Sequence, residues 1–153
     1  MTVVGAPPGF DRFPEVPALI ATYLSERAVD EELADAPPPW DIGALPEPLA
    51  SVMLNWTDSV CRWLNTTYAW QPNHVIPPCW KEHQQLAYEV AALAFARDDA
   101  YVNAGTTVVW HEQYERFTTR MNVMLGRGAD QCRVGRHDPR PSRFQLSVWH
   151  ADG

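Results

Sequence analysis

Two cysteine–histidine pairs are the residues of this 153-residue chain whose types and spacing best suit chemistry. The first pair is Cys79 and His83, in the stretch CWKEH, and the second pair is Cys132 and His137, in CRVGRH. Thiolate sulfur and imidazole nitrogen are standard zinc ligands, and four of them close a tetrahedral structural site. We therefore predict a structural zinc ion bound by both pairs.

The elements between the pairs must bring them together, and a helical hairpin would do so. The apolar side chains of residues 79–97 repeat at helical spacing, with Pro78 suited to the first turn. On such a helix Cys79 and His83 lie one turn apart on one face. A second helix, capped by Thr106 or Thr107 and ended by Gly126, returns antiparallel to the first and delivers the second pair beside the first.

The remaining histidines fit this site less well. His111 falls near the start of the returning helix, on the order of 20 Å from the site, and is expected at the surface. His74 precedes the first pair closely and is a reserve ligand. Two alternatives to zinc stay open: a reversible Cys79–Cys132 disulfide, or ordinary buried thiols beside ordinary polar histidines.

The rest of the sequence completes an all-α prediction: a three-helix core bundle with an N-terminal accessory helix and an irregular, zinc-stapled C-terminal segment. Residues 1–48 are predicted to form an acidic, proline-rich arm. The arm has a loose leader over 1–15, a helix at 17–33 and a spacer whose Trp40 docks on the helical domain. Residues 49–153 read as the helical domain, opened by an amphipathic helix over 49–67. The closing FQLSVWH is either a short strand or an extended arm.

Charge and composition indicate in which cellular compartment the protein is expected. The formal net charge is −7, and residues 1–48 carry all of it. The odd number of cysteines argues against a secreted disulfide framework. No apolar run approaches the roughly 20 residues of a membrane-spanning helix, and the N-terminus lacks signal-peptide character. These features predict a soluble cytoplasmic protein without a membrane partner.

The motifs PPCWKEHQQLAYEVAALAFA, VVWHEQYERF and CRVGRH together form a wider pattern. The pattern resembles a family of uncharacterised small proteins of actinobacteria and their plasmids, integrative elements and phages, with C-W-x2-H, then W-H, then C-x4-H. The resemblance covers about residues 56–137 and supports pairing the two cysteine–histidine motifs. It also singles out Trp80, Trp110 and His111, and it implies no reaction.

Enzyme motifs do not fit the chain. The PCW stretch lacks the upstream H-x-E and the second cysteine of a nucleotide deaminase, and no zinc-hydrolase, nucleophile-elbow or P-loop motif occurs. A zinc-dependent hydrolase is the least favoured prediction, because it needs an open coordination position.

We predict instead a non-enzymatic accessory or regulatory module of an actinobacterial mobile element or phage that binds another protein. Tryptophans in loops would be its anchors, or would equally well pack the loops onto the bundle. The alternative is a small nucleic-acid-binding regulator that uses the C-terminal arginines, although the net charge disfavours it. The candidate partner-binding residues are Trp80, Trp110, His111, Arg133 and Arg136.

Overall fold

The computed structural model describes residues 5, 7–139 and 144–146, and the regular secondary structure of these residues is helical, with no strand. The predicted all-α fold is therefore confirmed. The helices are α1 (Ala18–Val29), α2 (Leu49–Tyr68), α3 (Gln84–Ala100), α4 (Ala104–Leu125) and α5 (Ala129–Arg133), with short 3-10 turns η1 (Glu31–Leu33), η2 (Pro72–His74), η3 (Trp80–Glu82) and η4 (Gly126–Gly128).

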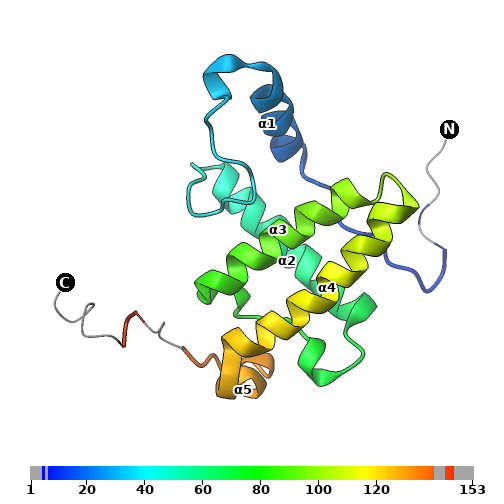
Figure 1. Cartoon of the computed structure of the whole chain (residues 1–153), viewed down its shortest axis with the longest axis vertical. Coiled ribbons are helices and arrows are strands. Elements are labelled where there is room, and N and C mark those ends of the chain that lie inside the picture. The colour runs from blue at the N-terminus through cyan, green and yellow to red at the C-terminus, as the bar shows by residue number, and fades with distance from the viewer. Residues whose placement is uncertain (1–4, 6, 140–143, 147–153) are drawn as a thin grey trace.

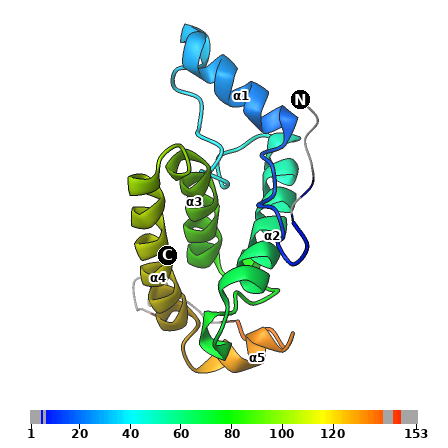
Figure 2. The same ribbon diagram turned by 90° about the vertical axis from the view of Figure 1, so that its right-hand side faces the viewer.

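The α3–α4 hairpin and α2 form the three-helix core. Helices α3 and α4 run antiparallel side by side, and α2 packs behind them as a second layer (Figures 1 and 2). Helix α5 lies across the end of the bundle where α4 finishes, and the chain between α2 and α3 passes the same end (Figure 2). The hairpin thus returns the chain to the start of α3, as the sequence predicts.

The ends of α4 show which residues stop and start the helix. The prediction that a threonine caps it is wrong, because the Asn103 side chain accepts a hydrogen bond from the Thr106 N–H at 3.0 Å. Asparagine is among the best helix caps, since its short side chain reaches free amides of the first turn. Gly126 ends the helix as predicted, with a positive φ of 57° that favours glycine.

One core extends through the bundle and continues into the arm. Ile20 of α1 and Leu45 of the proline-rich spacer are buried in it, so segments on both sides of Pro48 share it. The larger fully buried side chains, which carry most of the hydrophobic stabilisation, are Trp80, Trp110, Phe117, Met53, Leu64, Ile76, Leu86, Met121 and Leu125.

The N-terminal leader is attached more closely than predicted. The Trp63 indole donates a hydrogen bond to the Asp11 carbonyl at 2.9 Å, and the Trp56 indole donates one to the Pro14 carbonyl at 3.1 Å. Phe13 packs edge-on against both indoles. The prediction of a loose leader is therefore wrong for residues 11–14, because two tryptophans of α2 satisfy its backbone carbonyls and bury its aromatic ring.

The accessory helix and spacer follow the prediction in outline. Helix α1 projects beyond the bundle from the end near the start of α2 (Figure 1), and stops at Val29 before the turn η1. The Trp40 ring lies 5.4 Å from the Phe95 ring, so the spacer docks on α3 as predicted.

Two further observations concern membrane-spanning segments and the C-terminal residues 144–146. Among the described residues, no helix combines the length and the apolarity that crossing a bilayer requires. Residues 144–146 form a turn, and the rest of the predicted strand or arm lies outside the described residues.

Candidate metal centre

The two cysteine–histidine pairs meet at one pole of the bundle. Cys79 directly precedes η3, His83 separates η3 from α3, Cys132 belongs to α5, and His137 follows α5 in an irregular loop. One donor atom from each of the four residues lies within 4.8 Å of all the others. Such a group can hold a metal ion, as the hairpin argument predicts.

The shortest donor distances match tetrahedral coordination. The His83 Nε2 atom lies 3.5 Å from the Cys79 Sγ atom and 3.6 Å from the Cys132 Sγ atom. A tetrahedral zinc ion with Zn–S bonds of about 2.3 Å and Zn–N bonds of about 2.0 Å separates sulfur from nitrogen ligands by about 3.5 Å. The wider separations in the group, up to 4.8 Å, would need to close by about 1 Å around an ion.

The local backbone of the first pair differs from the prediction. Cys79 and His83 are not on one continuous α-helix, because residues 80–82 form a 3-10 turn and His83 is extended, with φ −104° and ψ 99°. Three successive i→i+3 hydrogen bonds run from the amides of residues 80, 82 and 83 to the carbonyls of residues 77, 79 and 80. The pair still converges, because the turn folds the His83 ring back over the Cys79 thiol at 3.5 Å.

Neighbouring polar groups orient the second pair. The Asp138 N–H donates a hydrogen bond to the Cys132 Sγ atom at 3.3 Å. The Glu82 carboxylate lies 3.7 Å from the His137 Nδ1 atom. A carboxylate at this nitrogen would hold the ring with its Nε2 lone pair free for a metal ion.

Burial sets the protonation of the first pair. Desolvation, reinforced by the neighbouring Cys132, raises the pKa of the Cys79 thiol to about 12, so without a cation it stays protonated at neutral pH. Desolvation and the nearby His137 lower the pKa of His83, which keeps the imidazole neutral and able to donate a lone pair. A bound cation would reverse the cost of the thiolate, because its charge favours the deprotonated sulfur.

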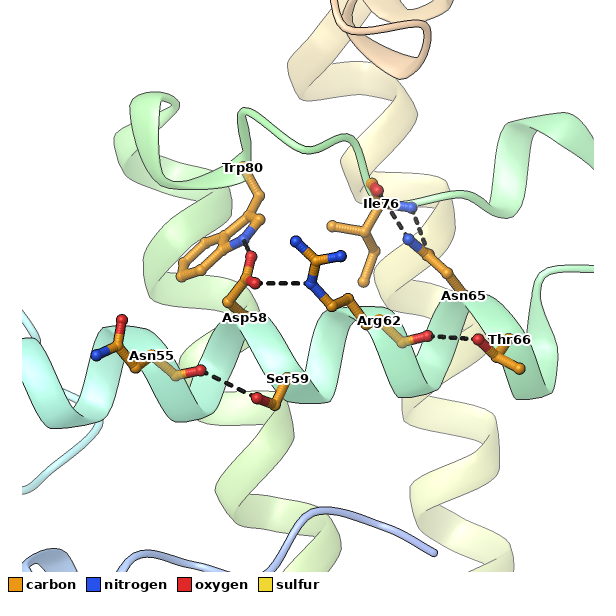
Figure 3. A network of polar contacts seen from close by, with 8 residues as sticks. All are labelled: Asn55, Asp58, Ser59, Arg62, Asn65, Thr66, Ile76 and Trp80. Atoms are coloured by element: carbon orange, nitrogen blue, oxygen red, sulfur yellow. Dashed lines mark hydrogen bonds and ion pairs between the residues drawn. The ribbon is translucent and has the colours of Figure 1, made fainter. Parts of the chain in front are cut away.

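Helix α2 holds the segment that carries Cys79 (Figure 3). The Trp80 indole donates a hydrogen bond to the Asp58 Oδ1 atom at 3.1 Å, and Arg62 donates to the Oδ2 atom of the same carboxylate at 2.9 Å. The Asn65 amide pairs with both the backbone N–H and the carbonyl of Ile76, at 2.8 and 3.0 Å. Sequence reasoning missed these positioning residues, because no local spacing links α2 to residues 76–80.

The carboxylate of Asp58 should make stability depend on acid pH. Burial alone would raise its pKa, but the hydrogen bonds from Trp80 and Arg62 outweigh burial and lower it. A lowered folded-state pKa gives stability that is present above the unfolded value of about 3.9 and is lost as pH falls through the folded value. We expect Asp58→Asn to cost roughly 1 kcal/mol at pH 7, a modest figure because the carboxylate is partly exposed, and progressively less as falling pH protonates the folded-state carboxylate.

Thermal unfolding of wild type and Asp58→Asn between pH 7 and pH 2.5 measures this effect. The exposed Asp35 provides the matched control, since Asp35→Asn removes the same charge from the arm and not from α2. A gap between wild type and Asp58→Asn that stays constant across the whole range would contradict the assignment.

Arg133, a predicted partner-binding residue, is used within the protein. Its guanidinium donates to the carbonyls of Val75 and Asn73 at 2.8 and 3.1 Å, and to the Asn122 Oδ1 atom at 2.6 Å. These bonds tie α5 to α4 and to the chain around η2, so the Arg133 guanidinium has a structural role, and partner binding by this residue stays a prediction. Arg136 is exposed, as a partner contact requires.

The tryptophans of the first two motifs, Trp80 and Trp110, are core residues in the structure. Trp80 is 1% exposed, so of the two alternatives for this side chain the packing one holds. Trp110 is equally buried and donates to the Leu93 carbonyl at 3.0 Å, which leaves it unavailable as a surface contact. Neither indole is therefore presented at the surface, and a role of these two residues in partner binding stays a prediction.

The other histidines lie outside the metal group. His111 is exposed, as predicted, and its Nε2 atom is 3.0 Å from the Tyr101 hydroxyl and 3.4 Å from the Tyr68 hydroxyl. His74, the reserve ligand, is not among the grouped residues, and its Nδ1 atom is buried without a hydrogen-bond partner in the described part of the chain.

The chain was compared with protein families, with curated proteins and with solved structures, and nothing in the three comparisons matches it. The resemblance to small actinobacterial proteins stays a prediction. The geometry of the site therefore carries the functional argument.

Proposed function

We propose that the protein is a non-enzymatic accessory or regulatory module whose fold is completed by a structural zinc ion and which binds another protein. The observation that carries the zinc part is the convergence of two thiols and two imidazoles, from the first and second pairs, within 4.8 Å. Soft sulfur and imidazole donors in a group of four favour zinc over magnesium or calcium.

The donor set also supports a structural rather than a catalytic ion. Four protein ligands fill a tetrahedral zinc ion and leave no position for the water that a hydrolase must activate. Zinc would join three segments that are separate in the sequence: the turn before α3, the short helix α5 and the loop after it. Its binding free energy would then contribute to folding.

The binding role is supported by one exposed tryptophan in the loop that follows α2. Trp70, in the loop between α2 and η2, is 87% exposed. Tryptophan is enriched at the centres of protein interfaces, because it combines a large apolar area with few rotatable bonds. By the resemblance, the partner would be a protein of an actinobacterial host or of its mobile element or phage.

Metal analysis tests the zinc part directly. We expect about one zinc per chain in protein purified without chelators, with an X-ray absorption spectrum fitted by two Zn–S bonds near 2.3 Å and two Zn–N bonds near 2.0 Å. The matched control is Cys61→Ser, which changes a buried cysteine of α2 outside the group and should keep the metal. A folded wild type without metal would reject the proposal, and a spectrum dominated by oxygen ligands would point instead to the hydrolase.

A further inference from the structure

We propose that the metal centre is also a peroxide-responsive switch, in which Cys79 and Cys132 join as a disulfide and release the metal ion. The inference rests on the proposed zinc site and adds a regulation to it. It begins with the fact that the two sulfurs approach the same His83 Nε2 atom, at 3.5 and 3.6 Å, from two separate segments.

The two sulfurs are close enough to react after a small movement. They lie within 4.8 Å of each other, and a disulfide bond requires about 2.05 Å, so they must approach by less than about 3 Å. Cys79 precedes a 3-10 turn and is not inside an α-helix, so a small shift of its backbone toward Cys132 would not disturb an α-helical hydrogen-bond ladder. Cys61, the remaining cysteine, is buried in α2 and outside the group.

The reaction is balanced with hydrogen peroxide as oxidant. One thiolate attacks a peroxide oxygen, the O–O bond breaks, and a sulfenic acid and hydroxide form. The second thiolate attacks the sulfenic sulfur, the S–O bond breaks, and a second hydroxide leaves as the S–S bond forms. Two electrons pass from the two sulfurs to peroxide, and two protons convert both hydroxides to water. Disulfide formation would leave only the imidazoles of His83 and His137 as ligands for a metal ion, too few to hold zinc in a structural site.

The site is covered on its outer side by a small, partly exposed loop. Cys132 is 1% exposed, but the side chain of His137 is 29% exposed and the residues from Val134 to Pro139 lie at the surface. An outward displacement of this loop would expose the sulfurs without opening the bundle, since local opening of a loop costs less than global unfolding.

The oxidised form would differ from the zinc form in a limited region. A Cys79–Cys132 bond keeps α5 attached to the start of α3, and the Arg133 hydrogen bonds to the chain around η2 are not involved. The loop that carries His137 loses its metal attachment. The switch therefore exchanges a zinc-held C-terminal loop for a released one, in which the chain around the already exposed Arg136 is no longer held in place, while the helical core persists.

The experiment uses the full-length, zinc-loaded wild type, whose metal content is measured first. After treatment with hydrogen peroxide, we expect release of about one zinc per chain to a chromogenic chelator, together with a Cys79–Cys132 disulfide in peptide mass mapping. Cys61 should remain a free thiol. Trypsin cleavage after Arg136 should become at least about tenfold faster, whereas cleavage after Arg116 in α4 should not change. Dithiothreitol plus zinc should reverse all of these effects.

Three results would overturn the switch. Zinc that stays bound under millimolar peroxide, zinc release with sulfinic acid in place of the disulfide, or a disulfide that includes Cys61 each contradict it while leaving the zinc proposal intact. Absence of zinc before the oxidant is added would instead reject the proposed function, and the switch with it. The Cys61→Ala variant serves as a control, because it should release zinc and form the same disulfide as the wild type.

Discussion

The Cys132→Ser variant should lose the zinc ion and unfold about 8–16 °C below the zinc-loaded wild type. A ligand present at 1,000 times its dissociation constant stabilises the folded state by about 4.1 kcal/mol. For a chain of this size, each kcal/mol shifts the midpoint of thermal unfolding by about 2–4 °C. Differential scanning calorimetry with excess free zinc measures the shift, and metal analysis of the same samples measures occupancy.

The matched control for this prediction is Cys61→Ser, the same chemical change at another buried cysteine. It should cost roughly 1–3 kcal/mol for burying a hydroxyl, but its midpoint should still fall when a strong chelator removes zinc. The wild type with chelator should approach the midpoint of Cys132→Ser, and that variant should not respond to chelator. Equal chelator responses in both variants would show that Cys132 does not hold the ion.

Much of the fold could be predicted from local sequence patterns. The apolar repeat that begins at Leu49 predicts α2, and the structure begins the helix at that residue. Gly126 stops α4 because its positive φ suits glycine. These signals work because helix period, breakers and terminating residues act over a few residues, whatever the rest of the chain does.

The metal group could also be predicted, because it depends on the topology of the helices more than on the local backbone geometry around each ligand. An antiparallel hairpin brings the two cysteine–histidine pairs to one pole, even though the predicted starting point of α3 is several residues too early. The local geometry could not be predicted. Trp80 is buried in the core and bonds to Asp58 of α2. Residues 80–82, which carry this side chain, form a 3-10 turn instead of the first turn of α3.

The contacts that sequence reasoning missed are bonds between residues far apart in the chain. The indole of Trp63 reaches the carbonyl of Asp11 across 52 residues, and the guanidinium of Arg133 reaches that of Val75 across 58 residues. Neither bond has a spacing that a single sequence can reveal. Both join side chains to backbone, so only the folded arrangement identifies the partner.

Trp70 and Trp80 look alike in the sequence but differ in the folded protein, because among the described residues only Trp80 of the two makes such a distant contact. This difference gives the second prediction with a large expected effect. Both Trp70 and Trp80 lie in the connection between α2 and α3. Trp80 is fully buried and its indole N–H bonds to Asp58 at 3.1 Å. Trp70 is 87% exposed. One should therefore contribute to stability and the other to binding.

Trp80→Ala should lower the free energy of unfolding by about 3–5 kcal/mol, because it leaves a large cavity and removes the indole hydrogen bond to Asp58, whose carboxylate keeps only its bond from Arg62. The midpoint of thermal unfolding should fall by about 6–20 °C. Zinc affinity should fall as well, since Cys79 is the adjacent residue. Trp70→Ala should change stability by less than about 0.5 kcal/mol, as is typical of exposed positions, and should keep the zinc ion.

Thermal unfolding, zinc titration and cross-linking to proteins of a cell extract, applied to both variants, measure stability, zinc affinity and partner capture together. A folded, zinc-loaded Trp70→Ala that no longer cross-links to a partner captured by the wild type would place the binding surface at the loop after α2. A Trp80→Ala variant as stable as the wild type would contradict the buried position of this side chain. Equal partner capture by wild type and Trp70→Ala would remove Trp70 from the binding surface, because its loss would then change neither the fold nor the interaction.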